Sequence, residues 1–127
     1  MQDHTKFTDH EFEESFTHEA HLRLAWIHLG LYGLHRALSN VTTQLRNFTA
    51  HLGATDKYNE TMTVAAIHAV HHFMIRSTTS NFSDFITENP RLVWNFKELM
   101  ASHYSTDIFQ SAEAKSRYLE PDLLPFD

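Results

Sequence analysis

The stretch that decides the fold is AHLRLAWIHLGLYGLHRALSNVTTQLRNFTAHLG, residues 20–53. Its apolar residues recur at alternating steps of four and three, at Ala20, Leu24, Ile27, Leu31, Leu34, Leu38, Val41, Leu45, Phe48 and Leu52. These steps follow one face of an α-helix and exclude a β-strand. Gly30 and Gly33 lie in the middle, and each glycine costs a helix interior about 1 kcal/mol. We therefore predict helices over 9–30 and 34–52 with a tight break between them; one continuous kinked helix is the alternative.

The rest of the chain also predicts helices. Gly53 is a suitable C-terminal cap for the second helix. Further helices are expected over 57–76, through FITEN (85–89) after a cap at Asn81 or Ser83, over 90–104 with Pro90 in the first turn, and over 105–118 with Ser105 or Thr106 as cap. The tail LEPDLLPFD (119–127) is apolar enough to pack along the bundle. The fold class is therefore all-α, a single-domain helical bundle of four to six helices covering 1–127.

Composition excludes several function classes. The 127 residues have a formal net charge of −6 and no Lys/Arg block, which argues against nucleic-acid binding. There are no cysteines, so a metal would be held by His and carboxylate. The chain has no Gly-rich phosphate loop, so its sequence does not indicate an organic cofactor. Without an apolar leader or an 18-residue apolar run, we expect a cytoplasmic protein that does not enter a membrane. The oligomeric state is not indicated.

Eleven histidines are the unusual feature of the chain. His21, His28 and His35 are spaced by seven and follow one line of a helix, on the flank of the apolar stripe. His28 is roughly 10 Å along the axis from His21, too far to share an ion with it. The pair His18 and His21 has chelating spacing, because residues three apart are neighbours on a helix. We expect the surface or second-layer histidines to be His4, His10, His28, His35 and His51.

A carboxylate for the histidine pair is available in KYNET, residues 57–61. Glu60 and Tyr58 would point into the bundle opposite His18 and His21, and helix bundles bind metals with such His and Glu sets. The alternative is a capping device with Asp56 as N-cap, completed by Glu60 or Asn59.

A separate candidate is the histidine group His68, His71 and His72. It would be a different site, because Glu60 and His71 are about 16 Å apart along a helix. The larger apolar side chains, including Trp26, Trp94 and Met62, are assigned to the core.

Four blocks together resemble a family of small helical, mostly bacterial proteins of unestablished activity. They are FTHEAHLRLAW (16–26), KYNETMTVA (57–65), NPRLVWNFKELMASHYSTDIF (89–109) and EPDLLPF (120–126). The family pattern reads approximately F-x-H-x-x-H-L-R-x-A-W, K-Y-H-E-T-x-T, Y-S-x-x-x-[LI]-F and P-D-L-x-P. The resemblance implies that the motif cores are His18, His21, Arg23, Tyr58, Glu60, Thr61, Tyr104 and Ser105. Asn59 stands where the family has His; if that His is an essential ligand or base, this chain has either lost it or replaced it by His68 or His103.

The leading hypothesis is a small metal-dependent enzyme with its site between the first helix and the start of the third. His18, His21 and Glu60 would bind a divalent ion such as Fe, Mn or Zn. Glu60 and Tyr58 would be catalytic, while Arg23 and Tyr104 would bind the substrate, a small molecule whose anionic group Arg23 would hold. The alternative is a metal-free helical binding or interaction module, with the cluster as a structural hydrogen-bond network. A third interpretation is a histidine-based pH sensor or loose metal buffer.

Overall fold

Three long helices form the body of the protein. The computed structural model describes the backbone of residues 9–126 and the side chains of residues 17–126. The long helices are α1 (Asp9–Tyr32), α2 (Leu34–His51) and α3 (Glu60–Met74), and each contacts the other two. The shorter elements are η1 (Thr55–Lys57), α4 (Phe82–Glu88), α5 (Arg91–Trp94), α6 (Phe96–Ala101) and α7 (Ala112–Ser116). The described residues contain no strand, so the predicted all-α bundle is confirmed. They form seven α-helices rather than the predicted four to six.

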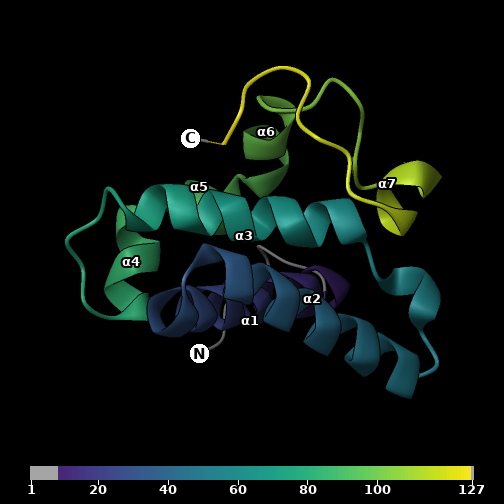
Figure 1. The fold of residues 1–127 in the computed structure, drawn as a ribbon, viewed down its shortest axis with the longest axis horizontal. Coiled ribbons are helices and arrows are strands. Elements are labelled where there is room, and N and C mark those ends of the chain that lie inside the picture. The colour runs from purple at the N-terminus through teal and green to yellow at the C-terminus, as the bar shows by residue number, and fades with distance from the viewer. Residues whose placement is uncertain (1–8, 127) are drawn as a thin grey trace.

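The arrangement places α3 at the centre. Figure 1 shows α3 between the α1–α2 pair and a layer that contains α5, α6 and the C-terminal segment. One core cluster runs through these layers, and its fully buried side chains include Leu22, Val41, Ile67, Leu92 and Ile108. Within residues 9–126, no helix has both the length and the apolar character needed to cross a membrane.

The break between α1 and α2 occurs at Gly33, as the glycine pair predicted. Gly33 has φ 83° and ψ 175°, a combination that is essentially restricted to glycine. Its N–H still donates to the carbonyl of Leu29, and its own carbonyl accepts from Ala37. The chain therefore turns within one residue while keeping its hydrogen bonds. The alternative of one continuous kinked helix is wrong.

The buried face of α1 differs from the predicted one. Ile27 and Leu31 belong to the predicted stripe but are 37% and 67% exposed. The buried residues are Leu22, Ala25 and Leu29, roughly opposite that stripe at 100° per residue. The helix is apolar on both sides, so its spacing could not choose the face. Because the face is reversed, His18 and His21 lie toward the interior rather than on its flank.

The predicted capping of α3 also needs correction. Asp56 does not cap this helix but lies in η1, and α3 begins only at Glu60. The N-cap is Asn59, whose Oδ1 accepts a hydrogen bond from the Met62 N–H at 2.9 Å. At the end of α2, Gly53 has φ 69° and Ala54 N–H donates to Thr49 C=O, the geometry of a glycine C-terminal cap.

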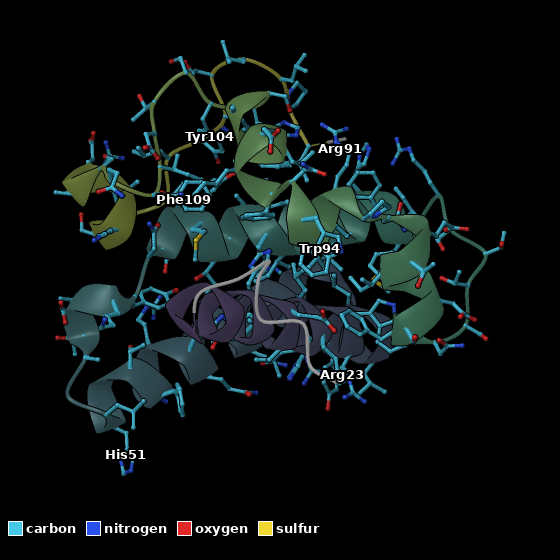
Figure 2. All side chains as sticks on the ribbon, turned by 180° about the vertical axis from the view of Figure 1, so that it is seen from behind. Arg23, His51, Arg91, Trp94, Tyr104 and Phe109 are labelled. Carbon is cyan, nitrogen blue, oxygen red and sulfur yellow. The ribbon has the colours of Figure 1, made fainter. Side chains whose placement is uncertain are left out.

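The C-terminal third is less helical than the sequence predicts. Asn81 caps α4 as expected, accepting from the Asp84 N–H. The helix predicted over 90–104 is split at Asn95 into α5 and α6. Asn95 has non-helical torsions and starts α6, a position that asparagine favours. Trp94, assigned to the core, is 59% exposed beside this break (Figure 2).

The helix predicted over 105–118 is reduced to α7, capped by Ser111 rather than by Ser105 or Thr106. The Asp107 carboxylate accepts from the Phe109 N–H, a local turn that competes with helix formation. Ser105 instead donates, through its N–H and its hydroxyl, to Asp122.

The tail packs along the bundle, as predicted, but only Leu119 and Phe126 of its four apolar side chains pack against the core, whereas Leu123 and Leu124 are exposed. Leu123 N–H donates to the His103 carbonyl, and His103 Nδ1 donates to the Leu124 carbonyl at 2.8 Å. The Phe126 ring stacks on His103, with centroids 4.2 Å apart, and also contacts His68. These contacts hold the tail against α3 and the segment after α6.

Candidate functional site

A small pocket lies between α1, α2 and α3. Its volume is about 20 Å³, room for a single water molecule or a metal ion. Most of the lining is apolar and comes from all three helices. The residues that carry donor or ligand atoms are His18, His21, Thr63 and Met62; the others are Leu22, Ala25, Val41, Leu45, Ala66 and Ile67.

His18 is held in one orientation by α5 and α6. Its Nε2 lies 2.8 Å from the Leu92 carbonyl oxygen, and its ring centroid is 4.5 Å from that of Phe96. A carbonyl oxygen only accepts, so Nε2 carries the proton and Nδ1 of the neutral ring has the free lone pair. Burial lowers the pKa of His18, although the hydrogen bond to Leu92 opposes this shift. The imidazole is therefore neutral near pH 7.

His21 lies one turn further along α1 and is also drawn inward. Burial lowers the pKa of His21, and the charge that His18 would carry lowers it further. Two neutral imidazoles consequently share one pocket. A metal ligand must be unprotonated, and metal-binding histidines usually donate their second N–H to a carbonyl or carboxylate. His18 satisfies both conditions.

Glu60 and Tyr58 form a separate cluster at the start of α3. The Tyr58 hydroxyl donates to Glu60 Oε1 at 2.6 Å, and Arg46 Nη2 of α2 donates to the same oxygen at 3.1 Å. The Arg46 guanidinium also lies 5.6 Å from the centre of the Tyr58 ring. Burial and the Glu60 carboxylate raise the pKa of Tyr58, so its hydroxyl stays protonated.

The predicted triad is thus divided between two neighbouring places. His18 and His21 line the pocket, whereas Glu60 is bonded to Tyr58 and Arg46 and is not part of the lining. Within the part of the chain that the structure describes, no three His, Cys, Asp or Glu side chains are grouped closely enough to hold a metal ion. The two places are close along α3, because Glu60 and the pocket residue Thr63 are one turn apart.

The predicted substrate residues Arg23 and Tyr104 do not meet. Figure 2 shows them on opposite sides of the molecule. Arg23 is exposed on α1 and does not line the pocket. Tyr104 is buried, and its hydroxyl donates to the Leu119 carbonyl at 2.8 Å. Burial raises the pKa of Tyr104, which therefore anchors the C-terminal segment as a neutral phenol.

The other histidines are distributed over the structure. His28 contacts the side chains of Asn40 and Gln44, and His35 and His51 are exposed, in agreement with the prediction. His68 stacks near Tyr118 and Phe126, whereas His72 contacts Arg76. His71 is half-buried. His4 and the side chain of His10 lie outside the described residues. The group 68/71/72 is not gathered around one point.

Asn59, the departure from the family pattern, is fully engaged in structure. It is 5% exposed; besides capping α3, its Nδ2 donates to the Ile108 carbonyl at 2.8 Å. The suggested replacements for the family's histidine, His68 and His103, both lie against Phe126 and not in the pocket lining.

Two pocket residues were missed by sequence reasoning. Met62 belongs to the predicted core and no prediction concerns Thr63, yet both line the pocket beside the histidines. The available signal was their place on α3, since residues 62, 63, 66 and 67 form one face of a helix. The sequence assigns the wrong buried face to α1, so it does not predict that this face of α3 lies beside His18.

Comparisons with known proteins add no relative: no family model matches the chain, and neither a curated protein nor a solved structure is similar enough to match. The resemblance of the four sequence blocks to a family of helical proteins therefore stays a prediction.

Proposed function

We propose that this protein is a small metal-dependent enzyme whose metal site is the pocket between α1, α2 and α3. His18 would bind the ion through Nδ1, and His21 would bind it from the next turn. The observation that carries this proposal is the bond from His18 Nε2 to the Leu92 carbonyl. This bond orients the imidazole, as a carbonyl commonly does for a metal-binding histidine, and leaves Nδ1 as the unprotonated nitrogen.

The proposal gives the Glu60 cluster a supporting role. A bound ion would act as a Lewis acid on a small molecule entering an open coordination position. Glu60, one turn before Thr63, is the nearest carboxylate on α3 in sequence. To become a third ligand, its Oε1 would have to exchange the bonds to Tyr58 and Arg46. Otherwise Glu60 and Tyr58 remain beside the site as a hydrogen-bonded pair that accepts or passes a proton.

The test is metal loading of the untagged chain. Fe²⁺ (without oxygen), Mn²⁺ and Zn²⁺ would each be added, and bound metal and the melting temperature measured. We expect one tight ion per chain and stabilisation of about 2.7 kcal/mol when free metal is 100 times the dissociation constant. The variants are His18→Gln and His21→Gln, with the exposed His35→Gln as matched control. Only His18→Gln and His21→Gln should lose the stabilisation by metal.

The contrary results are equally clear. If none of the three metals raises the melting temperature of the wild type, and Cu(I) does not bind either, the metal proposal fails. It also fails if His35→Gln weakens binding as much as His21→Gln does, because metal would then bind generally to surface histidines.

A second candidate function is a metal-free binding or interaction module. The specific observation in its favour is that Glu60 already accepts hydrogen bonds from Tyr58 and from Arg46 of another helix. On this alternative the cluster holds α2 against the start of α3. Glu60→Gln and His21→Gln would then both destabilise the fold while added metal had no effect. Retained stability together with lost metal binding would instead favour the enzyme.

A further inference from the structure

Met62 adds a third kind of ligand atom to the histidine pocket. It is half-buried on the first turn of α3 and lines the same pocket as His18 and His21. Met62, His18 and His21 all line one small volume of about 20 Å³. The asparagine cap accepts from the Met62 N–H, so this residue starts from a fixed backbone position.

The lining suits a soft ion better than a hard one. Thioether sulfur selects Cu(I), and imidazole also binds copper, whereas Mg²⁺, Ca²⁺ and Mn²⁺ prefer several oxygen ligands. The pocket offers one hydroxyl, from Thr63, and no carboxylate. Its remaining walls are aliphatic and cannot complete an oxygen shell. A monovalent ion with few ligands also places less charge among these apolar side chains.

We infer that the pocket is a Cu(I) site formed by His18 Nδ1, the His21 imidazole and the Met62 sulfur. This inference rests on the proposed function, because it names the ion and the third ligand of the same pocket. It differs from the His/Glu set expected from the sequence: Glu60 keeps its bonds to Tyr58 and Arg46, and the third ligand is Met62, two residues further along the same turn of α3.

The experiment is an anaerobic titration of Cu(I) into the full chain in competition with a coloured Cu(I) chelator. The informative variant is Met62→Leu, which conserves volume and preserves the fold. Met74→Leu, at the other end of α3, is the matched control. We expect one Cu(I) per chain, with affinity reduced more than about tenfold by Met62→Leu, since losing even a group that only hydrogen-bonds to a ligand costs about 10–100-fold. Met74→Leu should bind like the wild type.

X-ray absorption gives an independent readout. The wild type should show one sulfur and two nitrogen neighbours around copper, and Met62→Leu should lose the sulfur. Equal Cu(I) affinity in the wild type and Met62→Leu, or no sulfur neighbour, overturns the inference. The parallel zinc titration separates the two proposals. Zinc bound through His18 and His21 without tight Cu(I) binding leaves the metal enzyme standing, whereas failure to bind either ion removes both.

Discussion

Replacing Asn59 with aspartate separates the two hydrogen bonds that this buried residue makes. In the wild type, Oδ1 accepts from the Met62 N–H at 2.9 Å, and Nδ2 donates to the Ile108 carbonyl at 2.8 Å. Asn59→Asp keeps the cap but places a second oxygen against the carbonyl. If only the cap mattered, the variant would be as stable as the wild type or more so, because a helix N-terminus favours a negative charge by about 0.3–1 kcal/mol.

The expected result is a net loss of stability at pH 7. A buried carbonyl left without its donor costs about 1–3 kcal/mol, and the gain at the helix terminus offsets part of this. We therefore expect Asn59→Asp to lower the free energy of unfolding by about 1–2 kcal/mol. With an unfolding entropy of about 2.1 cal/mol/K per residue, the 127-residue chain should melt about 4–8 °C lower. Asn59→Ala, which loses both bonds, should cost about 2–4 kcal/mol.

Lowering the pH tests whether the charge of the introduced carboxylate causes the loss of stability. The introduced carboxyl faces a carbonyl in a buried place, so its pKa in the folded protein is raised above the unfolded value of about 3.9. The folded state then binds the proton more strongly, and the deficit relative to the wild type shrinks as the pH falls. Urea unfolding followed by circular dichroism between pH 4 and 7 measures this. Equal stability of Asn59→Asp and the wild type at pH 7 would refute the reasoning.

Three further predictions concern other positions. Gly33→Ala should destabilise the fold by about 1–3 kcal/mol, because Gly33 has a φ of 83°. Gly30→Ala should stabilise it by about 0.5–1 kcal/mol, because Gly30 is helical and an added Cβ meets no neighbouring atom. Thermal melts compare the two variants, and equal effects would contradict the break at residue 33. Thr61→Val removes a buried hydroxyl that hydrogen-bonds two backbone groups of the C-terminal segment. It should lower the free energy of unfolding, measured with urea, by about 2 kcal/mol. A decrease below about 0.5 kcal/mol, which is typical of a surface substitution, would show that Thr61 does not anchor this segment. In the metal-free protein, burial lowers the pKa of His18, so below pH ~6.5 the unfolded state binds more protons and the stability decreases as the pH is lowered. His18→Gln should flatten this dependence of stability on pH, whereas the exposed His35→Gln should not. An unchanged dependence in His18→Gln would show that this imidazole is not the cause.

Local signals predicted much of the secondary structure. Gly33 and Gly53 occupy backbone conformations with positive φ at the two ends of α2, where the sequence placed a break and a cap. The helix predicted over 57–76 is present as α3, and its buried residues Val64, Ile67 and Val70 follow one another at steps of three along one face. Around Asn95 and Asp107 the same reasoning failed. Non-helical backbone torsions at Asn95 and a local turn at Asp107 interrupt helices whose apolar pattern continues.

The candidate site was only partly predictable. The sequence singled out His18 and His21 from eleven histidines by their spacing, and the structure places both in one pocket. It also paired Tyr58 with Glu60, which do bond. The partner Arg46 comes from another helix, and no spacing rule indicates a contact of that kind. Met62 was overlooked for a similar reason, since its relation to the histidines depends on how α1 and α3 pack.

By itself, the sequence determined the helical class, the turn at Gly33 and the chelating spacing of His18 and His21, because each depends on neighbours within a few residues. Only the tertiary structure decided which side of α1 is buried. That helix is apolar on both faces, and the choice comes from how well each face packs against α2, α3 and α5. The same choice turned the histidine pair inward, gave His18 its partner at Leu92 and brought Met62, rather than Glu60, to the pocket.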